Sequence, residues 1–288
     1  MTHRPTHRAL WFAVLVTAWL GAMAWLVFQE AYPGLLNRPT PGYRSLLARG
    51  VMVMDRWMIV SFQNRPIGYT HTSVDVNEKD PAGLYRIKNQ TFLTLTVMGN
   101  RQRLSVHADA VTDSYYALQS FRFSLAAAGF SAVITGARTQ GEMFDLSIRG
   151  AGPPQHLSVT IPDDAVIYSP LTEMALKSLS PGQRISLKVF NPLSMASQTV
   201  TVRALRRETL RRKDKAIDTV VLSARMEGMD TLSWVDRDGV LIRQETPIGL
   251  TMESCEAREA LSLKSTGEAG DLLKLMNGIG TLNGKATP

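Results

Sequence analysis

Short apolar segments separated by turn residues recur along the chain from about residue 51 to residue 262. In the segment Leu104–Ala110, apolar and polar residues alternate with a period of two, which is typical of a strand with one buried face. The gaps between segments, such as 136–141 and 152–154, are rich in glycine and proline and are too short for a helical crossover. Successive strands are therefore expected to pair in antiparallel fashion.

We predict a mainly β protein whose large antiparallel sheet is strongly curved or forms an open barrel with one short helix. β-Branched and aromatic residues are concentrated in the apolar segments, as in Trp57–Phe62. The Asp238-Gly239 pair is the expected chemistry of a tight hairpin turn. The expected strands span residues 51–62, 67–74, 85–97, 104–110, 116–125, 131–135, 143–149, 156–161, 184–190, 198–205, 216–224, 231–235, 240–245 and 246–254.

One segment interrupts the β pattern and predicts a short helix between Ser169 and Gly182. Ser169 suits the N-cap, Pro170 suits the first turn, and Pro181-Gly182 would end the helix. We expect this helix to close one end of the sheet.

A short pattern, P-I-G-x-T-x-x-S, occurs twice, at residues 66–73 and 247–254. Two interpretations of this repeat are open. The domain consists of two equivalent halves, or the same local chemistry serves two unrelated strand entries.

The segment from Ala9 to Phe28 contains twenty residues without a charge. As a helix it would span roughly 30 Å, the thickness of the hydrocarbon core of a bilayer. Ala22-Met23-Ala24 fits a signal-peptidase site, so a cleaved signal is the alternative interpretation. We favour an uncleaved anchor, because the apolar run is longer than the usual core of a signal and continues past that site.

Basic residues flank this segment on both sides, so charge alone does not fix its orientation. We expect a cytoplasmic N-terminus and a location in the bacterial inner membrane, with the C-terminal domain in the periplasm. The expected organisation is a cytoplasmic N-terminus (1–8), a transmembrane anchor (9–28), a stalk (29–50), an extracytoplasmic β-domain (51–262) and a loose C-terminal tail (263–288).

The net charge is +7, and one basic segment near residue 210 supplies much of it. Aromatic residues that stack on bases are missing near this segment, so we do not expect nucleic-acid binding. The default interpretation is a solvated hairpin tip, and the alternative is a patch that contacts anionic lipid head groups. The basic residues of the segment are Arg203, Arg206, Arg207, Arg211, Arg212, Lys213 and Lys215.

Cys255 is the single cysteine, which excludes an intrachain disulfide framework and a cysteine-cluster metal site. A nucleophilic cysteine needs a nearby base, and no local pattern links Cys255 to His71, His107 or His156. The three histidines also lack the close spacing of a zinc motif. We therefore predict no enzymatic activity, no metal and no cofactor.

Two segments of the chain resemble a recurring bacterial pattern. Residues 57–71, which include Ile67-Gly68-Tyr69, and residues 234–249 are similar to the opening and closing strands of an extracytoplasmic β-domain that often precedes transglutaminase-like domains. The resemblance covers roughly residues 51–262 and implies a stand-alone accessory domain without the Cys-His-Asp catalytic domain, so it assigns no catalytic residue. In architecture, the expected sheet also resembles periplasmic lipid-carrier half-barrels.

The leading functional hypothesis is a non-enzymatic, membrane-anchored envelope protein whose external β-domain binds a partner protein or an apolar or lipid ligand. Met52, Met54, Met58 and Met98 would suit an adaptable apolar groove, and core packing explains them equally well. The alternative is an accessory subunit of a transglutaminase-like protease or of another envelope enzyme. A thiol enzyme would require Cys255 within hydrogen-bond reach of one of the three histidines.

Overall fold

The computed structural model describes residues 54–76, 85–97, 100–114, 117–166, 179–192, 194–212, 215–226, 229–266 and 270–271. The predicted anchor (9–28), the stalk (29–50) and most of the predicted helix 169–182 lie outside these residues. None of the helices within the described ranges is both long enough and apolar enough to cross a membrane.

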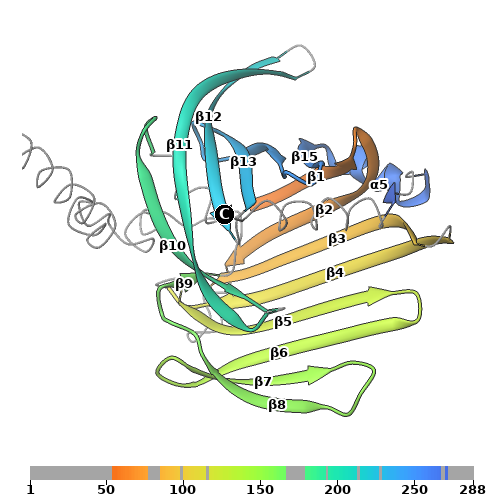
Figure 1. Ribbon diagram of the computed structural model, residues 1–288, viewed down its shortest axis with the longest axis vertical. Helices are drawn as coiled ribbons and strands as arrows, with labels where there is room; N and C mark the ends of the chain where they lie inside the picture. The colour runs from red at the N-terminus through yellow and green to blue at the C-terminus, as the bar shows by residue number, and fades with distance from the viewer. Residues whose placement is uncertain are drawn as a thin grey trace, which may run out of the picture. The chain divides into compact units, whose positions relative to one another are not determined.

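The described residues confirm a mainly β protein, and all sixteen described strands belong to one sheet (Figure 1). The first strands are β1 (Met54–Phe62), β2 (Arg65–Val76), β3 (Tyr85–Val97), β4 (Asn100–Thr112), β5 (Leu118–Ala127), β6 (Phe130–Gln140), β7 (Met143–Arg149) and β8 (Gln155–Thr160). The later strands are β9 (Ala165–Val166), β10 (Arg184–Asn191), β11 (Ala196–Arg212), β12 (Lys215–Met226), β13 (Met229–Asp236), β14 (Leu241–Glu245), β15 (Leu250–Cys255) and β16 (Gly270–Asp271).

The chain enters the sheet at its centre. From β1 it runs outward strand by strand to β8, crosses to β9 and β10 at the opposite end, and returns inward to β15. β15 then pairs with β1, with Trp57 opposite Cys255 and Phe62 opposite Leu250. We call β1–β8 the N-terminal wing, β10–β15 the C-terminal wing, and the β1–β15 pair the seam. The path from β8 to β10 through the seam is antiparallel, as predicted, and two short parallel pairs (β9 with β10, β16 with β3) extend it.

The two wings face each other across the larger of two hydrophobic clusters. Alternate residues of nearly every strand point into it, including Phe144, Leu146 and Phe190, which are at most 2% exposed. The rings of Phe121 on β5 and Phe190 on β10 lie 5.5 Å apart, although many strands separate β5 from β10 in the sheet. The sheet is therefore strongly curved. It is not closed, because the described residues of its two end strands, β8 and β9, do not pair with each other.

Arg138 on β6 forms several hydrogen bonds near the point where the chain leaves the N-terminal wing. Its guanidinium donates to the carbonyl oxygens of Leu118 (2.8 Å) and Gly141 (2.6 Å) and to the carboxylate of Asp163. The cationic group also lies 5.0 Å from the centre of the Phe144 ring. Arg138 therefore connects Asp163, in the segment between β8 and β9, to strand β5 and to the turn after β6.

The single described helix, α5 (Ala257–Thr266), was not predicted. It packs on β2 and β1, on the face opposite the core, where Ala260 is fully buried and Tyr69 is 2% exposed. Its apolar residues are few and no proline or glycine marks its ends, so it gave no periodic signal. α5 continues past residue 262 to Thr266, and Gly270–Asp271 pairs with β3.

The two P-I-G copies have different structural roles, which does not support two equivalent halves. Gly68 lies within β2, where an added Cβ would come 1.9 Å from the carbonyl oxygen of Phe92, so only glycine allows β2 to approach β3 this closely. Gly249 lies in the turn before β15 with φ of 84°, a conformation that favours glycine. Residues 246–249, expected to belong to the last strand, form this turn.

Candidate functional site

Most of the basic segment belongs to strand β11, at the end of the β11–β12 hairpin. β11 continues to Arg212, so that only residues 213 and 214 separate it from β12; Lys213 lies outside the described residues. Threonine and leucine occur between the arginines, and Thr209 and Leu210 pair with Asp218 and Ile217 of β12. The prediction of a turn here was wrong. The many charged residues obscure the alternating pattern of a long strand in the sequence.

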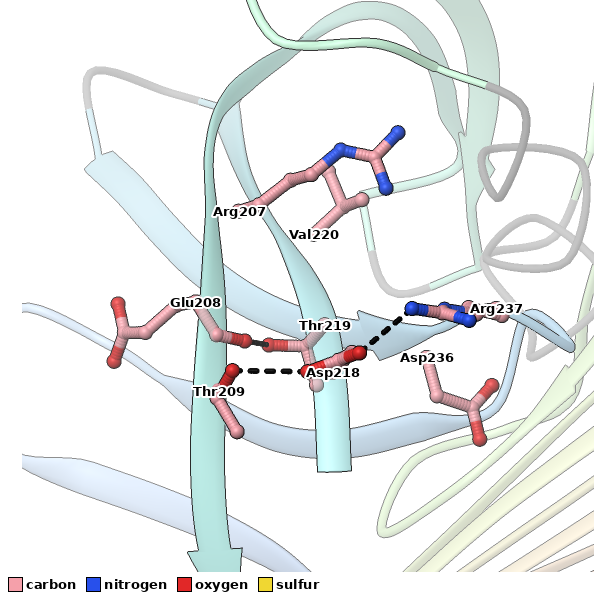
Figure 2. A pocket seen from close by; sticks show the side chains of 8 residues that line it. All are labelled: Arg207, Glu208, Thr209, Asp218, Thr219, Val220, Asp236 and Arg237. Carbon is pink, nitrogen blue, oxygen red and sulfur yellow. Dashed lines mark hydrogen bonds and ion pairs between the residues drawn. The ribbon is translucent and has the colours of Figure 1, made fainter. Parts of the chain in front are cut away.

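The strand alternation divides the basic residues between two faces. A bulge at Leu205 places Arg203 opposite Ser223 and Arg206 opposite Val221, which puts both arginines on the face away from the core. Arg207 is opposite Val220 and so lies on the other face. Figure 2 shows Arg207 and the carboxylate of Glu208 projecting to different sides of β11. The six described residues of the segment therefore do not form one patch: Arg207 and Arg211 lie on one face, and Arg203, Arg206, Arg212 and Lys215 on the other.

A polar cavity of about 440 Å³ lies between β11, β12 and the turn after β13 (Figure 2). Its polar groups mostly bind one another. Asp218 accepts from the Thr209 hydroxyl (2.9 Å) and pairs with Arg237 (2.7 Å), and Thr219 donates to the carbonyl oxygen of Glu208 (2.7 Å). Only Arg207 adds a positive charge without an ion pair to another described residue of the lining. The cavity offers little unused hydrogen-bonding capacity to a ligand.

Arg212 connects the end of this hairpin to the seam. Its guanidinium donates to the Ser254 hydroxyl at 3.3 Å. Next to Ser254 lies a second open cavity, of about 510 Å³, whose lining includes Asp55, Arg56, Cys255 and Glu256. In the parts of the chain that are described, no group of three or more His, Cys, Asp and Glu side chains is arranged to hold a metal ion.

The Cys255 thiol is not an activated nucleophile. Burial raises its pKa to about 11, and the carboxylate of Glu259 adds to the rise, whereas Arg212 acts in the opposite direction. Trp57 pairs with Cys255 on one side and with His71 on the other, so Trp57 lies between the thiol and that imidazole. The rings of Trp57 and His71 stack with centres 3.9 Å apart. A thiolate–imidazole pair therefore does not form between these residues.

The histidines are spread over three strands and have separate partners. His71 on β2 contacts the carboxylate of Asp55. His107 on β4 lies edge-on to Phe92 at 5.4 Å, and His156 is exposed on β8, at the far end of the N-terminal wing from Cys255. The described structure does not bring the three histidines together.

An apolar groove lies beside α5 on the outer face of the N-terminal wing. Its volume is about 240 Å³, and it lies between Leu263 of the helix and strands β2, β3 and β4. A row of aromatic contacts leads into it, since Tyr69 lies 5.7 Å from Trp57 and 5.3 Å from Phe92 between ring centres. Sequence reasoning missed this groove because it depends on α5. The available signal was Tyr69 and Phe92 at positions that alternation assigns to the solvent face. The other lining residues are Gly68, Leu93, Thr94, Arg103, Leu104 and Ser105.

No protein-family model and no curated protein matches this chain. Among solved structures, it is similar to a β-barrel-like protein of the domain of unknown function DUF1849 from Brucella abortus, with 9% identity and a TM-score of 0.47, over 70% of this chain and 94% of that chain. It is also similar to a DUF1089 family protein from Pseudomonas aeruginosa, with 13% identity and a TM-score of 0.34, over 60% of this chain and 87% of that chain. At these values the similarities carry no argument about function.

Proposed function

We propose that this chain is a non-enzymatic envelope protein, tethered to a membrane by residues 9–28, whose β-domain binds an apolar segment of a partner protein in the groove beside α5. The groove is the observation that carries this proposal. Tyr69, Phe92, Leu104 and Leu263 line it. Apolar surface gathered at a concave site is the usual signature of a binding surface.

The volume of the groove favours a protein segment over a whole lipid. At about 240 Å³ it is smaller than the roughly 300–1,000 Å³ of small-molecule pockets. It accommodates one or two apolar side chains, such as those that anchor a peptide. A lipid ligand is the second candidate, and it would bind in the same groove, because the concave side of the curved sheet is filled by the core.

Leu263→Glu tests the binding site. A charge inside an apolar groove opposes burial of a partner's side chain, so the variant is expected to lose its bound protein after gentle detergent extraction. Leu261→Glu is the matched control, because it adds the same charge to the same helix at an exposed position. Mass spectrometry of co-purifying proteins and lipids reads the result. Equal recovery of every partner with Leu263→Glu and the parent chain would refute this site, and a co-purifying lipid lost only with Leu263→Glu would favour the second candidate.

The tether rests on the uncharged run from Ala9 to Phe28. The full chain is expected to resist extraction from membranes at alkaline pH, and a chain without residues 9–28 is expected to be released. Protease added to intact spheroplasts should digest the β-domain if it lies outside the cytoplasm. Its survival in intact spheroplasts, with digestion only after lysis, would reverse the proposed orientation.

A further inference from the structure

Strand β8 forms one end of the sheet and has a neighbour on one side only (Figure 1). It pairs with β7 along its whole length, Gln155–Thr160, and no other described strand pairs with it. An end strand presents a row of unpaired backbone groups, to which a strand of another chain can add. β8 is the longer of the two end strands, since β9 at the opposite end contains only two residues.

The hydrogen bonds of β8 show which of its backbone groups face the open edge. Directly after β8, the Ile161 N–H donates to the Glu142 carbonyl oxygen at 2.8 Å, and these two residues continue the register of β7 with β8. In an antiparallel pair, such hydrogen-bonded pairs alternate with pairs whose backbone groups point away from the partner strand. The N–H and C=O groups of His156, Ser158 and Thr160 therefore point toward the open edge.

This edge lacks the features that usually keep edge strands from pairing. Charged residues, prolines and bulges protect many such edges. β8 has the sequence QHLSVT, which contains no proline and no Lys, Arg, Asp or Glu, and its register with β7 has no bulge. Prolines stand only outside the strand, at positions 153, 154 and 162. The open edge is therefore an uncharged stretch of six residues with defined ends.

The two faces of β8 differ in polarity. Leu157 and Val159 are partly buried and pack against the large core, whereas His156, Ser158 and Thr160 are exposed on the other face. A strand that adds to this edge must therefore present apolar residues on the core side and polar residues on the outer side, and it needs no charge. β8 itself has this pattern.

We propose that β8 pairs with β8 of a second copy of this chain, in antiparallel fashion around a two-fold axis at Ser158. In this register, Ser158 is opposite its own copy, and His156 is opposite Thr160 of the second copy. Every outward N–H group of β8 then meets a carbonyl oxygen of the other copy. Leu157 is opposite Val159 on the core side, so the apolar face continues from one copy into the next.

Other two-fold axes would lose edge hydrogen bonds. Axes centred one residue to either side of Ser158 also keep the apolar face continuous, but they place an edge residue opposite Pro154 or Pro162, and proline has no N–H to donate. The axis at Ser158 is therefore the one that pairs all the outward groups. Two strands of six residues form a small interface, so we expect a weak dimer with a Kd on the order of micromolar or above.

A cysteine at the axis tests this register. In the full chain carrying Cys255→Ser, Ser158→Cys places two thiols opposite each other, at a Cα separation of about 5.5 Å that suits a disulfide. Mild oxidation of freshly lysed cells that produce this variant should form a linked dimer at least about tenfold faster than with Ser131→Cys. Ser131 is an exposed serine on β6, and its variant corrects for random collisions of the chains. Equal rates for the two variants, or linkage of Ser158→Cys to a different protein in place of a dimer, would overturn the proposal.

Paired charges then test which residues face each other. His156→Lys with Thr160→Lys sets like charges opposite each other twice in the dimer, and it should weaken self-association about fivefold. His156→Lys with Thr160→Glu sets opposite charges against each other at the same positions and should preserve self-association. Energy transfer between purified full chains that carry different C-terminal fluorophores measures the association. Equal self-association of the two double variants would contradict this register.

A proline at the axis removes the edge donor itself. Ser158→Pro deletes one outward N–H from each copy and no backbone bond to β7, so it should weaken self-association roughly 30-fold with little change in melting temperature. Unchanged energy transfer with a folded Ser158→Pro chain would exclude β8 as the contact between the copies. Neither the groove beside α5 nor the tether enters these measurements, so the failure of either proposal leaves this test intact.

Discussion

The two wings share one large core, yet the strand register brings different surface charges together in them. In the N-terminal wing, charges of opposite sign face each other across neighbouring strands: Asp75 opposes Arg86, and Asp109 opposes both Lys88 and Arg122. In the C-terminal wing, Arg184 opposes Arg203. The C-terminal wing also contains pairs of opposite sign, Arg225 with Asp230 and Arg243 with Glu253, so the contrast between the wings lies in the like-charge pair that the register of β10 with β11 produces.

In the N-terminal wing, oppositely charged residues of neighbouring strands form ion pairs. Arg86 donates through Nε (3.0 Å) and Nη2 (2.7 Å) to the two carboxylate oxygens of Asp109, and Lys88 lies 3.5 Å from Asp75. The hydrogen bond to Asp109 raises the pKa of Arg86 further above its ordinary value. These charged groups satisfy one another, which is consistent with the proposal that the apolar groove is the binding surface of the N-terminal wing.

The largest expected effect tests whether the wings form one cooperative unit. Phe190→Ala removes a ring that is 2% exposed and contacts Phe121 of the other wing, and should lower the free energy of unfolding by about 3–5 kcal/mol. Phe130→Ala, at a 46% exposed position, should cost less than about 0.5 kcal/mol. Denaturant unfolding measured by circular dichroism and tryptophan fluorescence should give one transition. Two separate transitions would show that the wings are independent.

Cys255 reports on the seam. Since its pKa is raised from the ordinary 9.0 to about 11, the thiolate fraction at pH 8 falls about 100-fold, and alkylation by iodoacetamide should slow by the same factor relative to the unfolded chain. The alkylation rate of the folded chain should increase with pH and level off near pH 11. A rate at pH 8 equal to that in denaturant would mean that the two wings separate at the seam.

Arg138 tests the corner that connects the N-terminal wing to the crossing segment. Arg138→Met keeps an unbranched apolar side chain against Phe144 and removes the bonds to Leu118, Gly141 and Asp163, and it should cost about 2–3 kcal/mol of stability. Arg149→Met, on the exposed surface of β7, is the matched control and should cost less than about 0.5 kcal/mol. Equal melting temperatures for the two variants would remove Arg138 from this role.

The smallest expected effect is the change in stability when one surface arginine is neutralised, and its sign should differ between the two wings. Arg86→Gln should destabilise the fold by about 0.5 kcal/mol, since it leaves Asp109 without its main partner. Arg203→Gln should be neutral or stabilising by a few tenths of a kcal/mol, since it relieves the contact with Arg184. At low salt, the urea unfolding midpoints of the two variants should differ from that of the parent chain. At high salt, the three midpoints should become nearly equal.

The strand pattern could be predicted because hydrophobic alternation and turn residues are local signals. Leu104–Ala110 and the Asp238-Gly239 turn were both placed correctly, within β4 and between β13 and β14. The pairing of β1 with β15 could not be predicted, because no local residue pattern specifies a partner so distant in the chain. The antiparallel, curved sheet was predicted from the short gaps between strands. The crossing of the chain from β8 to β9, at the opposite end of the sheet, could be seen only in the structure.

The candidate sites were predicted less well than the fold. The sequence shows that the basic residues are close together along the chain, but their division between two faces depends on the bulge at Leu205 and on the register of β11 with β12. The opposition of Arg184 and Arg203 depends on a second register, between β10 and β11. The apolar groove depends on α5, whose placement is determined by contacts with Tyr69 and neighbouring residues more than by its own sequence.

The central position of β1 also constrains how the domain is made. Trp57 is among the first residues of the sheet to be synthesised, and its partner Cys255 follows roughly 200 residues later. Until β15 emerges, one edge of β1 has no strand to bind, and an unpaired edge invites pairing with other chains. Formation of the seam must therefore be a late, slow step, and a chaperone that shields the edge of β1 during synthesis would protect the protein at its most vulnerable point.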